Sequence, residues 1–171
     1  MIPARQVMLA AFLIWIAAVL QGRVAHAIAI RGAQPDLPLV VLSGCALLVG
    51  SLRGTMLGFW AGLLAAASFS ASYGSAFAGR IVTGAFAGSL GSSLIRSNLL
   101  VPPLVAFAAT LLAEAVGTLI APSLAVHHLR RWLIQTGGEV LYNTVLALPI
   151  YLGLRLCRIG QIRDDPFGQR L

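Results

Sequence analysis

The sequence predicts an all-α integral membrane protein, built as a bundle of six transmembrane helices. Hydrophobic residues make up 58% of the 171-residue chain, and charged residues only 10%. The apolar residues gather into about six long blocks, and runs of roughly 18 or more such residues can cross a bilayer. Because backbone N–H and C=O groups must be satisfied within lipid, each block is expected to be a helix.

The first expected helix covers residues 6–23, with a longer alternative that continues to Ile30. Arg5 before the apolar run and the segment Ala25-His26-Ala27 together resemble a signal peptide with its cleavage site. Further apolar blocks follow, which favours an uncleaved first span.

The second and third expected helices follow a break near Pro35. Asp36 is placed as an N-cap, and Pro38 suits the first turn of a helix over residues 37–52. Sixteen residues would span only about 24 Å, which is short for a bilayer core of about 30 Å. Arg53-Gly54 is then expected to form a tight turn into a third helix over residues 55–73.

The last three expected helices fill the C-terminal half. Gly74-Ser75 should turn into a helix over 76–95, and further helices are expected over 99–121 and 139–155, the last kinked by Pro149. The connection 122–138 is the longest. Its segment 123–136 has the pattern of an interfacial helix with Trp132 at headgroup level, or else of a loop that dips into the interface.

The domain boundary and the orientation follow from this order. Residues 1–157 are expected to form the transmembrane domain, and 158–171 a short cytoplasmic tail. All 12 basic residues are arginine. Six spans put both termini on one side, together with seven arginines: Arg5, Arg53, Arg96, Arg155, Arg158, Arg163 and Arg170. The other side has four, Arg23, Arg31, Arg130 and Arg131. The positive-inside rule therefore predicts cytoplasmic termini.

Composition also excludes several classes of function. The net charge of +7 comes from arginines at the ends of apolar blocks, whereas nucleic-acid binders carry a basic patch on a soluble face. Cys45 and Cys157 lie far apart, and His26, His127 and His128 have no further ligands beside them, so no metal site is expected. No catalytic motif is present, so no enzymatic activity, catalytic residue or cofactor is predicted.

Small residues recur every four positions in two of the expected helices. Gly54, Gly58 and Gly62 begin one stripe, which Ala66 and Ser70 continue. Gly84, Gly88 and Ser92 form the second stripe. Such stripes let helices approach closely in lipid, either within the bundle or against another membrane protein.

Polar residues inside the expected spans are few. Glu114 is the only acid deep within a span, and Arg80 lies at a similar depth, so we expect an intramembrane Arg80–Glu114 pair or, alternatively, a ligand or proton site at Glu114. Glu139 and Asn143, with Tyr142 between them, form a polar cluster at the start of the last span. A structural role in helix capping and cross-bonding is expected for this cluster.

Three segments resemble the MreD family, the integral membrane subunit of the bacterial rod-shape system. They are Pro35-Asp36-Leu37, then Arg53-Gly54 with Gly58-Phe59 and Gly62-Leu63-Leu64, and last Asn143 before Leu148-Pro149. Family members often carry an acid just after the second segment, where this chain has Ala65-Ala66-Ala67. Any role built on that acid is therefore not expected here.

The resemblance implies a non-enzymatic scaffold of the elongasome in the bacterial inner membrane, which supports peptidoglycan synthesis and cell shape. Its partners would be an MreC-type periplasmic protein and, through it, MreB filaments and cell-wall synthases. The family fold is similar to the substrate-binding S-components of energy-coupling-factor vitamin transporters, so such a subunit is the alternative function. A pore would need a polar stripe along several helices, and here polar residues occupy only the outer half.

Overall fold

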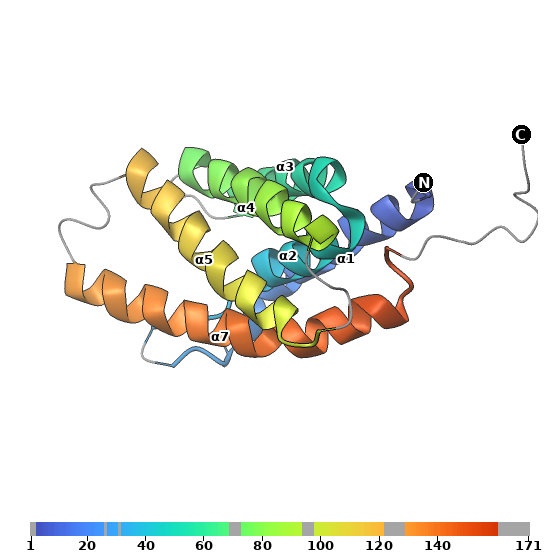
Figure 1. Cartoon of the computed structure of the whole chain (residues 1–171). Coiled ribbons are helices and arrows are strands. Elements are labelled where there is room, and N and C mark those ends of the chain that lie inside the picture. Colours follow the sequence, from blue (N-terminus) through green and yellow to red (C-terminus); the bar gives the residue numbers. More distant parts are fainter. Residues whose placement is uncertain are drawn as a thin grey trace, which may run out of the picture.

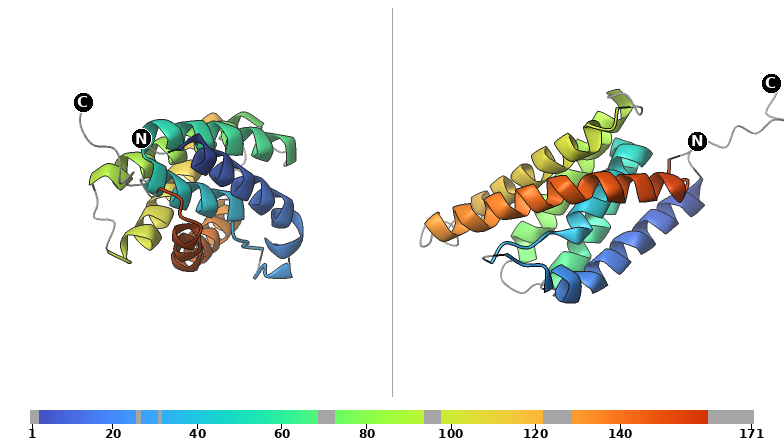
Figure 2. Two further views of the ribbon diagram at one scale, coloured as in Figure 1. Left: turned by 90° about the vertical axis from the view of Figure 1, so that its right-hand side faces the viewer. Right: turned by 90° about the horizontal axis from the view of Figure 1, so that it is seen from below.

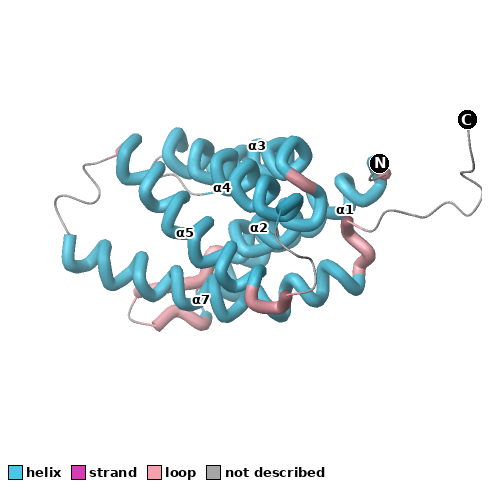
Figure 3. The backbone as a smooth tube through the Cα atoms, viewed as in Figure 1, coloured by secondary structure: helices cyan, strands magenta, loops and turns pink. Residues whose placement is uncertain are grey.

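The computed structural model is all-helical over the residues it describes (Figures 1 and 3). It describes residues 3–25, 27–30, 32–68, 73–93, 98–121 and 129–160. The α-helices are α1 (Ala4–Leu20), α2 (Leu37–Val49), α3 (Ser51–Ser68), α4 (Tyr73–Ser93), α5 (Val101–Ile120) and α7 (Leu129–Leu156). A π-helical turn, η1 (Gln21–Ala25), continues α1. The predicted helical class is therefore confirmed for this part of the chain.

Two of the described helices are long and apolar enough to cross a membrane, judged by length and composition. They are the α1–η1 segment Ala4–Ala25 and α5. The central helix α2 is apolar but has 13 residues, which gives it a length of only about 20 Å.

Helix α2 lies at the centre of the molecule and contacts α1, α3, α4, α5 and α7. Eleven of its residues are buried. A helix that is hydrophobic on all sides gains most when other helices surround it. Its side chains Leu42, Cys45 and Leu48 belong to the main hydrophobic core, to which Ile14 and Tyr151 contribute from the first and last helices.

The expected boundary between the second and third helices was wrong. Helix α2 ends at Val49, and the chain turns at Gly50 with a φ of 88°, a conformation that glycine adopts without strain. Arg53 and Gly54, expected to form the turn, lie inside α3. Gly74 and Ser75 likewise lie in the first turn of α4. Gly54 serves close helix packing, since a Cβ there would lie 2.5 Å from the Gly84 carbonyl oxygen, and sequence patterns do not separate this use of glycine from turn formation.

Helices α5 and α7 form the remaining wall, and here the expected connection was too long. The segment 129–138 belongs to α7, whereas a connection up to residue 138 had been expected. Gly137-Gly138 does not interrupt the helix. Gly138 packs so closely on Ala33 that a Cβ there would collide with the Ala33 side chain, so tertiary contact offsets the poor helix propensity of glycine. Residues 129–136 are thus helical, as one alternative expected, but they run without a break into the last helix instead of forming a separate one. Residues 122–128 lie outside the described residues.

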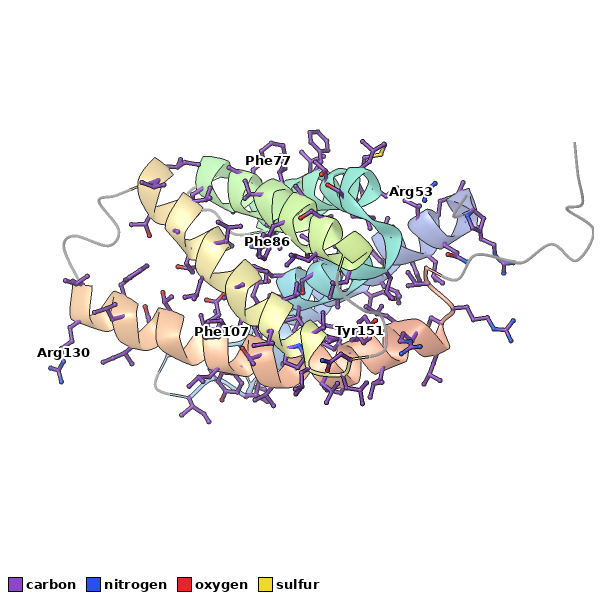
Figure 4. The ribbon with its side chains drawn as sticks, in the orientation of Figure 1. Arg53, Phe77, Phe86, Phe107, Arg130 and Tyr151 are labelled. Atoms are coloured by element: carbon purple, nitrogen blue, oxygen red, sulfur yellow. The ribbon has the colours of Figure 1, made fainter. Side chains whose placement is uncertain are left out.

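Both described ends of the chain lie at the same end of the bundle (Figures 1 and 2). The backbone N–H of Gly160, just after α7, donates to Gln6 Oε1 of α1 at 3.0 Å. Arg53 lies at this end, and Arg130 lies at the opposite end of the molecule (Figure 4). We call the end that carries Arg130 the distal end.

Candidate functional site: a polar pocket in the distal half of the bundle

A cavity of about 330 Å³ lies among α3, α4, α5, α7, η1 and the connection between η1 and α2. It is lined by polar groups and small residues: Gln21, Gln34, Pro35, Asp36, Ala65, Ser75, Ala76, Gly79, Arg80, Ala113, Glu114, Gly117 and Glu139. Arg80 lies seven residues into α4, and Glu114 lies six residues before the end of α5. At 1.5 Å per residue, both lie about 10 Å from the distal ends of their helices.

Asp36 organises one wall of the pocket through both carboxylate oxygens. Oδ1 accepts a hydrogen bond from the backbone N–H of Leu39 at 3.0 Å, so Asp36 is the N-cap that the sequence predicted for α2. Oδ2 forms a salt bridge with Arg80 of α4. The side chains of Asp36 and Arg80 are only 15% and 11% exposed, so the pair is largely shielded from solvent.

The expected Arg80–Glu114 pair was therefore wrong. Arg80 pairs with Asp36, and Glu114 Oε2 instead accepts a hydrogen bond from the Thr136 hydroxyl of α7 at 3.3 Å. The expectation compared the depths of residues within the helices and left Asp36 in a connection outside the bundle. In the structure the connection before α2 folds inward, because α2 is short and its N-terminus starts beside α4.

Asn143 joins three segments of the fold and is fully buried. Its Oδ1 accepts from the backbone N–H of Asp36 at 2.9 Å, and its Nδ2 donates to Thr110 Oγ1 of α5 at 3.0 Å. The Thr110 hydroxyl in turn donates to the Ala106 carbonyl at 2.8 Å. The amide of Asn143 thus holds α7 against α5 and against the start of α2.

Gln21 was not among the residues predicted to matter. Its Nε2 donates to the Pro35 carbonyl and its Oε1 accepts from the Leu37 N–H, both at 2.8 Å. A buried side chain in η1 thereby fixes both sides of the Asp36 backbone. The available signal was a lone amide side chain at the end of an apolar run, a place where a polar group needs partners.

Glu139 completes the charged lining. Its carboxyl interacts electrostatically with Asp36, Glu114 and Arg80, and it lies close to the Asn143 side chain. Arg80 is thus the one basic side chain facing three carboxyl groups in the described lining of the pocket. Within the described residues, Arg80 Nε is buried without a hydrogen-bond partner, so the guanidinium is held by fewer bonds than it could form.

The small-residue stripes meet each other between α3 and α4. A Cβ at Gly58 would lie 2.5 Å from the Arg80 carbonyl oxygen, and one at Gly62 would lie 2.8 Å from the Phe77 ring. Gly54 and Gly84 oppose each other directly, and Gly88 packs on the backbone of Gly50 and Ser51. Both stripes therefore face the inside of the bundle. Ser70 lies outside the described residues, as does the side chain of Ser92.

Neither cysteine lines the pocket. Cys45 is buried in the core and Cys157 is exposed. His26, His127 and His128 lie outside the described residues. Among the residues that the structure describes, no group of three or more His, Cys, Asp or Glu side chains is close enough to hold a metal ion.

Comparisons with models of known protein families, with curated proteins and with solved structures found no match to this chain. The resemblance to the MreD family rests on the sequence segments alone.

Proposed function

We propose that this chain is a non-enzymatic membrane scaffold of the bacterial cell-shape machinery, of the MreD type. One observation carries the proposal: the segments that bear the resemblance are also those that hold this bundle together. Asp36 of the first segment bonds to Asn143 of the last at 2.9 Å, and Gly54 and Gly58 of the second let α3 lie against the backbone of α4.

Two observations support placement in a membrane. The α1–η1 segment and α5 are long and apolar enough to span it. Large apolar side chains are also exposed along the outer faces of α1, α5 and α7, among them Met8, Leu104 and Val145. In water such a surface would favour association, whereas lipid tails cover it without cost. We propose six spans with both termini in the cytoplasm.

An apolar groove supplies the contact with the partner in this proposal. Its volume is about 420 Å³, and it lies between the α1–α2 connection and the distal half of α7. Its walls are Ile30, Ala33, Ile134, Gly138, Leu141, Tyr142 and Val145. The Tyr142 hydroxyl donates to the Ile28 carbonyl at 2.8 Å, which fixes the rim. The groove suits the transmembrane helix of an MreC-type protein, because small and apolar residues favour helix contacts in lipid.

The test is an affinity purification from native membranes with partners identified by mass spectrometry. The proposal expects a periplasmic MreC-type coiled-coil protein together with cell-wall synthases. Val145→Trp, which fills the groove at a 72% exposed position, should lose that partner. Leu104→Trp, at a 65% exposed position of α5 outside the groove, is the matched control and should retain it. Equal recovery with both variants would contradict the groove assignment.

The polar pocket favours a second candidate function, that of a substrate-binding subunit of a vitamin transporter. Its volume of about 330 Å³ lies at the lower end of the range for small-ligand sites, about 300–1,000 Å³. The same purification separates the two functions. Recovery of ATPase subunits and a transmembrane coupling protein, in place of the coiled-coil partner, would establish the transport function.

A further inference from the structure

Acidic side chains outnumber basic ones in the described lining of the pocket. Four ionisable side chains line it, three of them acids, and the one base, Arg80, already forms a salt bridge with Asp36. Glu114 and Glu139 remain. Thr136 donates a hydrogen bond to Glu114, but a hydroxyl carries no charge to offset a carboxylate. Carboxyl groups that share a low-dielectric site disfavour ionisation of one another unless a cation joins them.

The shape and lining of the cavity limit what that cation can be. A cavity of about 330 Å³ is larger than a bare ion requires, and the described residues offer no cluster able to hold a metal. Ala65, Ala76 and Ala113 give part of the wall an apolar surface that suits a short alkyl segment. The lining disfavours an anionic ligand, because it holds three carboxyl groups and its one guanidinium already forms a salt bridge with Asp36.

We propose that this pocket binds a small organic cation, with its ammonium group between Glu114 and Glu139. The ammonium donates to the carboxylates, and the alkyl part lies against the alanines. This site is compatible with a transport subunit and also with a scaffold that carries a bound ligand. The inference therefore depends on the pocket alone, and its test needs no partner protein.

The test is isothermal titration of the purified full-length protein in phosphatidylcholine nanodiscs. The probes are butane-1,4-diammonium, neutral butan-1-ol and butyrate. We expect saturable binding of the diammonium at one site per chain, and no binding of butyrate or butan-1-ol. The double variant E114Q/E139Q should lower the affinity for the diammonium by about tenfold or more, because charge-assisted hydrogen bonds are lost. The tail variant D164N/D165N makes the same change in net charge and should bind as wild type.

A second variant tests the site without removing a charge. A Cβ at Gly117 would meet only the Ser75 Cβ, at 3.9 Å, so Gly117→Leu can fold and fill part of the pocket. This variant should lower the affinity for the diammonium by about tenfold or more. The control is Gly153→Leu, where a Cβ meets nothing within 4 Å, and its affinity should stay at the wild-type value. If E114Q/E139Q does not fold, the Gly117→Leu and Gly153→Leu variants decide whether the pocket binds the diammonium.

Nanodiscs containing phosphatidylethanolamine distinguish the two sources of an ammonium group. Competition by this lipid would assign the site to a lipid headgroup, and unchanged affinity would assign it to a free amine. The proposal is overturned if the diammonium does not bind the wild-type protein. It is also overturned if butyrate binds equally well, or if the carboxylate and Gly117 variants both keep wild-type affinity.

Discussion

At the scale of single residues, Asp36 connects the local structure of α2 to the charge balance of the pocket. It caps the helix through Oδ1 and forms a salt bridge with Arg80 through Oδ2. Asn143 accepts from the backbone N–H of Asp36 itself, and Gln21 holds the backbone on either side of it. A buried ion pair is costly to break on one side, because the remaining charge stays in a low-dielectric site. Substitutions of Arg80 and of Asp36 are therefore expected to cost different amounts of stability.

Arg80→Gln should destabilise the protein more than Asp36→Asn. Loss of Arg80 leaves three carboxyl groups without a cation, at a cost of about 3–5 kcal/mol. Asparagine at position 36 still caps α2, and Glu139 remains near the guanidinium, so its cost should be smaller. Thermal and denaturant unfolding in detergent measure both. A larger loss for Asp36→Asn would contradict this account of the pocket charges.

At the scale of helices, the contact between α3 and α4 depends on glycines that place backbone against backbone (Figure 1). Phe59 and Phe77 close the contact edge to face, with ring centroids 5.2 Å apart. If lipid surrounds the bundle, the hydrophobic effect contributes little to helix association, since lipid tails are as apolar as leucine. Close packing of small residues then contributes more to holding α3 against α4. The stripes are thus used inside this chain.

Gly58→Ala should force α3 and α4 apart, because the added Cβ would lie 2.5 Å from the backbone oxygen of Arg80. The expected loss in the free energy of unfolding is about 1–3 kcal/mol, as for other overpacked contacts. Gly153→Ala in α7 is the matched control. Its Cβ meets no atom within 4 Å, so it should be neutral or stabilise by up to about 1 kcal/mol. Equal unfolding midpoints for the two variants would show that the α3–α4 contact adapts freely.

The sequence predicted the helical class, the cap at Asp36 and the approximate extent of α1 and α5, because apolar run length and capping chemistry are local signals. It misplaced the turn at Gly50 and the start of α7, because a glycine that packs and a glycine that turns look alike in sequence. It also mispaired Arg80. Which carboxylate meets a guanidinium depends on how the η1–α2 connection folds inward, and Gln21, which fixes that connection, has no recognisable motif.

At the scale of the whole molecule, the bundle is polar inside at its distal half and apolar at its core and outer faces. Arg80 and Glu114 of the polar pocket lie about 10 Å from the distal ends of their helices. Arg130 lies at that end, and Arg53 and both described chain ends lie at the other (Figure 4). This division agrees with the orientation that we propose, in which the distal end faces the periplasm. The native cysteines test it directly.

A membrane-impermeant maleimide should label Cys157 in inverted inner-membrane vesicles and leave it unlabelled in intact spheroplasts. Cys157 is exposed next to the end of α7, while Cys45 is fully buried and should stay unlabelled in both preparations. In a Cys157→Ser background, Arg130→Cys should show the reverse pattern, because Arg130 is exposed at the distal end. Labelling of both positions from the same side would contradict the proposed orientation.

The proposed role in cell shape is tested most directly by depleting this protein in its native host and measuring cell width and the pattern of new peptidoglycan. The account predicts that cells widen and round up, that wild-type protein restores the rod shape, and that Val145→Trp does not restore it although it reaches the membrane. Unchanged cell shape after depletion, accompanied by loss of uptake of a small nutrient, would contradict the scaffold function and assign the protein to transport.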